Sequence, residues 1–112
     1  MKLKPGVRLH GFTPQMALAA VVIDGVYRER HVECVITSAN DSRHSPTSLH
    51  HGLQGKYTDG LCRAMDIRTK NYYGDKFQLR EDIAEALGDD FDVVLEDLDG
   101  PNEHIHVEYD PK

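Results

Sequence analysis

Two histidines and an aspartate in the second half of the chain are residue types that bind metal ions. His104 and His106 stand in the segment HIHVEY. Because side chains alternate along a strand, both imidazoles and the carboxylate of Glu108 are expected on one face of it. A catalytic zinc site usually takes three His, Asp or Glu ligands and leaves a fourth position for water. Asp66, in the segment CRAMDIR, and a histidine of the polar stretch before it would complete such a set.

A metal site of this kind needs a nearby carboxylate as general base. Zinc lowers the pKa of a bound water toward about 7, and the base then takes the proton. Glu96 and Glu103 both stand shortly before the HIH triplet. Taken singly, these histidines and acids also suit a solvated strand edge, and it is their combination that favours metal chemistry.

Three short segments resemble a known family when they are read together. They are SLH at residues 48–50, RAMDI at 63–67 and HIH at 104–106. Their order is similar to the SxH…GxAxD…HxH signature of the M15-type zinc peptidases, which the signalling domain of hedgehog proteins shares. The group includes D-Ala-D-Ala carboxypeptidases and dipeptidases, and the L-alanyl-D-glutamate endopeptidases of phage lysins.

The resemblance implies a role for each matching residue. His50, Asp66 and His106 would be the three ligands of a Zn2+ ion. Ser48 would lie close to the site and contact substrate. His104 would lie beside the metal, where it can support the water or the transition state.

Two other positions stay open in this reading. The hedgehog-like branch has an acid at the end of the strand before the HxH hairpin, which falls on Glu96. The lysin and dipeptidase branch has it three residues before the last ligand, which falls on Glu103. The HIH triplet favours Glu96. Arg43 has two interpretations. It would place a cation near the developing oxyanion, as related enzymes do, or it is a solvated residue of the loop.

The spacing between the first two ligands departs from the family pattern. Residues 51–65 separate His50 from Asp66, a longer stretch than the family usually has. The neighbouring His51 is therefore an alternative first ligand. We expect the extra segment, roughly residues 52–61, to loop out over the site and shape substrate access, because loop closure costs grow slowly with length.

The elements that would position these residues follow from caps and periodicity. Thr13 and Pro14 predict the start of a helix, and Asp75 and Gly88 bracket a second one. The expected order is helix 14–30, strand 31–37, loop 38–61, strand 62–68, helix 76–87 and strands 91–96 and 104–109. This predicts a single α+β domain over residues 1–112, a small antiparallel sheet with flanking helices, and the resemblance implies a hedgehog/DD-peptidase-like fold.

Composition narrows the possible partners. The 112 residues carry 13 Lys and Arg against 19 Asp and Glu, a net charge of −6, which argues against a nucleic acid as binding partner.

No apolar signal segment or membrane-length run is present, so we expect synthesis in the cytoplasm. The resemblance implies a peptidoglycan stem peptide as substrate, reached from a virion or at lysis. The alternative is a zinc-stabilised binding or virion-structural module without turnover. The oligomeric state stays open.

Overall fold

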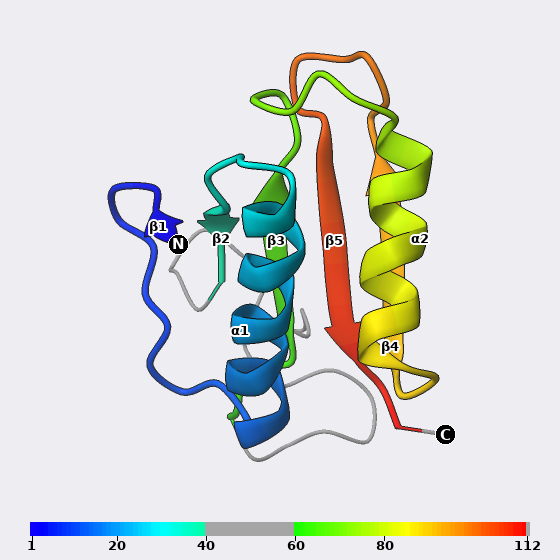
Figure 1. Cartoon of the computed structure of the whole chain (residues 1–112). Helices are drawn as coiled ribbons and strands as arrows, with labels where there is room; N and C mark the ends of the chain where they lie inside the picture. The colour runs from blue at the N-terminus through cyan, green and yellow to red at the C-terminus, as the bar shows by residue number, and fades with distance from the viewer. Residues whose placement is uncertain (40–59, 112) are drawn as a thin grey trace.

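The computed structural model describes residues 1–39 and 60–111, which form a five-stranded sheet and two helices (Figure 1). The elements are β1 (Lys2–Leu3), α1 (Pro14–Glu29), β2 (Val35–Ser38), β3 (Ala64–Arg68), α2 (Lys76–Leu87), β4 (Phe91–Glu96) and β5 (His104–Tyr109). The strand order is β1-β2-β3-β5-β4. The α+β class predicted from the sequence is thereby confirmed. Neither helix of the described part is long and apolar enough to cross a membrane.

The sheet is mixed, so the predicted antiparallel arrangement holds for every strand pairing of the described residues except one. β1 runs parallel to β2 at one edge, whereas the other three pairings are antiparallel. The amide of Lys2 donates to the carbonyl of Cys34 at 2.8 Å, and that of Lys4 donates to Ile36 at 2.9 Å. A strand of two residues is too short to show the alternation by which strands are found in a sequence.

Helix α1 begins where the sequence predicted. The hydroxyl of Thr13 accepts a hydrogen bond from the amide of Met16 at 3.1 Å, and Pro14 follows in the first turn. At the other end His31 has a φ of 57°, and the amide of Val32 donates to the carbonyl of Tyr27. This left-handed helix end uses residues that were predicted to be strand, so β2 begins only at Val35.

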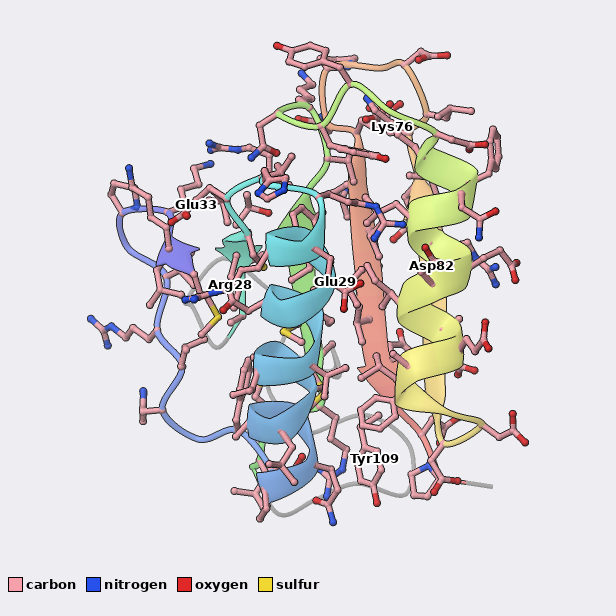
Figure 2. All side chains as sticks on the ribbon, viewed as in Figure 1. Arg28, Glu29, Glu33, Lys76, Asp82 and Tyr109 are labelled. Carbon is pink, nitrogen blue, oxygen red and sulfur yellow. The ribbon has the colours of Figure 1, made fainter. Side chains whose placement is uncertain are left out.

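Helix α2 and the last two strands have the predicted bounds. The side chain of Asp75 accepts a hydrogen bond from the amide of Gln78 at 3.0 Å, and Gly88, with a φ of 88°, ends the helix. Figure 1 shows α1 and α2 on the same side of the sheet. The guanidinium of Arg30, which caps the end of α1, donates to Asp82 on α2 and so joins the two helices. Figure 2 labels Asp82 on α2.

Alternation divides the central strands into a core face and a polar face. Ile67, Ile105 and Val107 are fully buried in the core cluster that includes residues of both helices. Burying each such side chain stabilises the fold by roughly 1.5–3 kcal/mol. The residues between them therefore project from the opposite face, and there the register pairs Asp66 with His106.

Candidate metal centre

Asp66 and His106 form the centre of the polar face. They are direct partners in the antiparallel pairing of β3 with β5. The Nδ1 atom of His106 lies 2.6 Å from Oδ1 of Asp66, and each side chain is 18% exposed. The sequence predicted both residues as zinc ligands, and the structure brings them into contact.

Glu108 holds the other side of the His106 ring. Its Oε1 atom lies 2.7 Å from Nε2 of His106, so the imidazole is placed between two carboxylates. Burial lowers the pKa of His106, but the hydrogen bonds to Asp66 and Glu108 outweigh it and raise the pKa to about 10. Strand alternation predicted that Glu108 lies on this face, but no role was predicted for it. Its position two residues after His106 was the signal that could have identified it as a partner of the imidazole.

His104 and Glu96 lie next to this pair. They are partners in the pairing of β4 with β5, and Nε2 of His104 lies 3.3 Å from Oε1 of Glu96. Nδ1 of His104 donates to the carbonyl of Asn102 at 2.6 Å, which fixes the ring orientation. Oε1 of Glu96 is 4.0 Å from Nδ1 of His106, and 47% of the Glu96 side chain is exposed.

Glu103, the other candidate base, lies in a different environment. It immediately precedes β5 and is buried, whereas His104 is partly exposed. Its carboxylate accepts hydrogen bonds at 2.5 Å from both Lys76 and Thr69, and at 2.8 Å from the amide of Asp99. Burial raises the pKa of Glu103, but these hydrogen bonds outweigh it and lower the pKa to about 2.

Comparisons with family models, with characterised proteins and with solved structures find no match to this chain. The likeness to the zinc peptidases therefore rests on the three short segments of the sequence.

The other predicted site residues lie outside the described ranges. These are Arg43, Ser48, His50 and the alternative ligand His51, together with nearly all of the segment 52–61. Within residues 1–39 and 60–111, no group of three or more His, Cys, Asp and Glu side chains is arranged to hold a metal ion. The described residues thus bring together two of the three predicted ligands.

The Asp66–His106 pair fits a zinc ion in its donor atoms and in its surroundings. A carboxylate oxygen and an imidazole nitrogen are ordinary zinc ligands, and two ligands of one tetrahedral zinc lie about 3.3 Å apart. The observed 2.6 Å separation would have to open by about 0.7 Å, a small change in side-chain torsion. Histidines that bind a metal usually donate their second ring nitrogen to a carboxylate, which is what Glu108 offers.

A hollow of about 690 Å³ adjoins the pair. Its lining residues are Lys4, Thr37, Asp66, Arg68, Lys70, Asn71, Tyr73, Pro101, Asn102, Glu103 and His104. Because Asp66 and His104 belong to its wall, a molecule in the hollow would lie directly against the candidate centre. The arrangement therefore combines a potential metal site with space for a ligand.

Proposed function

We propose that this chain is a zinc-dependent peptidase of the M15 type, with a hedgehog/DD-peptidase-like fold, that hydrolyses peptide bonds of peptidoglycan stem peptides. Both a D-Ala-D-Ala carboxypeptidase and an L-Ala-D-Glu endopeptidase agree with the motifs. The observation that carries the proposal is the contact of Asp66 with His106, with the carboxylate of Glu108 behind the imidazole.

Asp66 and His106 would hold the zinc together with His50. When bound, zinc supplies polarisation of the scissile carbonyl and a water of lowered pKa. Glu108 would keep the His106 ring in the orientation that presents Nδ1 to the metal. His104, fixed by the carbonyl of Asn102, would offer Nε2 to the developing negative charge.

The geometry supports Glu96 as the general base. Its carboxylate lies on the same face as Asp66 and His106, close to both histidine rings, and is partly exposed to solvent. It can therefore accept a proton from an attacking water and pass it to the leaving amine. Glu103 is held by Lys76 and Thr69 toward the core, and its lowered pKa makes it a weak base.

The test is mass spectrometry of peptidoglycan fragments incubated with the full chain, with added zinc and separately with a chelator. Zinc-dependent loss of one D-Ala identifies a carboxypeptidase, and release of a stem peptide from its alanine identifies an endopeptidase. A His106→Ala variant should lose both metal and cleavage. If the unaltered chain retains one zinc per molecule and cuts no fragment, the peptidase proposal is wrong and the binding module takes its place.

A further inference from the structure

Strand β4 ends the sheet, and within residues 1–39 and 60–111 only one of its sides has a partner strand. The strand order finishes with β5-β4, and Figure 1 shows β4 at the edge of the sheet, behind α2. The open side of an edge strand is a row of backbone N–H and C=O groups to which another extended segment can add.

The ladder with β5 shows which backbone groups of β4 lie on the open side. The amide of Asp110 donates to the carbonyl of Asp90 at 2.8 Å, so Asp90 belongs to the residues that bond to β5. Because antiparallel pairs alternate, the N–H and C=O groups of Val93 and Leu95 point to the open side. The carbonyl of Val93 there accepts from Nε of Arg80 at 3.1 Å. In the described part of the chain, the amide of Val93 and both backbone groups of Leu95 have no hydrogen-bond partner.

A groove of about 430 Å³ lies beside these groups. Phe77, Arg80 and Glu81 of α2 line it together with residues 93–95 of β4. The side chains of an added strand would point alternately to its two faces. On one face they would lie near the ring of Phe77, which is 61% exposed, and on the other beside Val94, which is 47% exposed. The middle of an added strand is therefore expected to be apolar.

Acidic side chains surround this apolar stretch. Asp92 and Glu96 precede and follow residues 93–95 on β4, and Glu81 lies across the groove on α2. Arg80 is the one cation among the described residues of the wall, and its guanidinium is paired with Glu81. A strand with a cation at each end and apolar residues between them is complementary to this charge pattern.

A second copy of this chain fits the same edge less well. An antiparallel pairing of β4 with itself, centred on Val93, places Asp90 of each copy opposite Glu96 of the other. Like charges that are directly opposite destabilise a strand pair. The charges therefore favour a cationic partner over self-association.

We propose that the open side of β4 binds an extended segment of a partner protein in antiparallel orientation, with Lys or Arg at both ends of a short run of β-branched residues. Backbone hydrogen bonds to Val93 and Leu95 would hold the segment, and its cations would lie beside Asp92 and Glu96. Main-chain bonds supply the affinity in such strand addition, and alternate side chains supply the specificity. The proposal requires neither a metal nor cleavage, so it does not rest on the proposed function.

The test uses the peptide Lys-Val-Val-Val-Lys, acetylated and amidated, titrated into the full chain with chelator present. NMR chemical shifts give the affinity, and we expect the amides of Val93 and Leu95 to shift. The peptide Glu-Val-Val-Val-Glu should bind at least about tenfold more weakly. N-methylation of the second residue, which would face Leu95, should weaken binding about tenfold, because it removes a backbone hydrogen bond. N-methylation of the third residue is the matched control, because its N–H would point away from β4 and its loss should change little.

A pair of variants connects the charge preference to the groove. Glu81→Gln should weaken binding of the lysine peptide about two- to fivefold. Glu85→Gln makes the same change on an exposed part of α2 that does not line the groove, and it should have no effect.

Four results would overturn the proposal. They are the absence of binding at millimolar peptide, equal binding of the lysine and glutamate peptides, equal effects of the two N-methylations, and equal effects of the two variants. Light scattering and hydrogen exchange of the chain alone test the other occupant. A dimer in which the Leu95 amide is already protected would assign the edge to a second copy and would also overturn it.

Discussion

Replacing Glu103 by Gln should destabilise the fold while sparing most of the chemistry. The carboxylate is 2% exposed and forms an ion pair with Lys76, which Figure 2 shows at the start of α2. The pKa of Glu103 falls from 4.5 to about 2, a shift that corresponds to about 3 kcal/mol of stability. Because Lys76 is 20% exposed, solvent screening reduces this, and we expect a loss of about 2 kcal/mol at pH 7.

The loss should depend on pH in a defined direction. A carboxylate whose pKa is lower in the folded state than in the unfolded state stabilises the fold fully above about pH 5, and the effect disappears as the pH falls toward 2. Urea unfolding at pH 7 should therefore show the midpoint of Glu103→Gln lowered by about 1 M. At pH 3 the difference between variant and unaltered chain should be much smaller.

Two comparisons make this reasoning refutable. Glu85→Gln, an exposed change on α2, the helix that begins with Glu103's partner Lys76, should leave the midpoint unchanged. Lys76→Met should destabilise about as much as Glu103→Gln, and the double variant should lose less than the sum. Equal midpoints for Glu103→Gln and the unaltered chain at both pH values would refute the buried ion pair. A folded Glu103→Gln chain as inactive as Glu96→Gln would make Glu103 the base.

Three further predictions concern the base, the ring partner and a helix cap. Glu96→Gln should lower peptide cleavage about 10²- to 10⁴-fold with little change in the urea midpoint, and near-normal cleavage would exclude Glu96 as the base. Glu108→Gln should weaken zinc binding about 10- to 100-fold, because the second ring nitrogen of His106 loses its carboxylate partner. Competition with a chromogenic chelator measures the zinc affinity. An unchanged affinity would contradict the orienting role of Glu108. Thr13→Ala should cost about 1 kcal/mol in urea unfolding by removing the hydroxyl that accepts from Met16, and an unchanged midpoint would show that the cap contributes nothing.

Local signals allowed most elements to be predicted. Caps and alternation gave the bounds of α2, β4 and β5, and the start of α1, because these signals depend on neighbouring residues only. These signals did not predict β1, which is too short to show alternation. They also did not predict the left-handed turn at His31, because of which β2 begins later than expected. Deriving the contact of Asp66 with His106 from the strands alone would have required the register between β3 and β5, which the alternation within each strand does not specify.

Strand alternation, applied to the sequence, could have helped to choose between Glu96 and Glu103 as the general base. Counting in steps of two from His106 reaches His104 but never Glu103, so alternation alone places that acid on the other face. Spacing from the last ligand, taken from the family likeness, pointed to it nonetheless. Where the two criteria disagree, alternation has the more direct physical cause, because it follows from backbone geometry.

The two faces of β5 are nevertheless coupled through the turn before it. Glu103 accepts from the amide of Asp99, and Asp97 accepts from the amide of Asn102, so the β4–β5 turn is held by carboxylates at both ends. That turn sets the register in which Glu96 meets His104. Glu103 therefore supports the site through this turn, and it also lines the hollow beside Asp66 and His104. A Gln at this position still accepts the Asp99 hydrogen bond, which is why we expect its folded form to lose less than tenfold in cleavage.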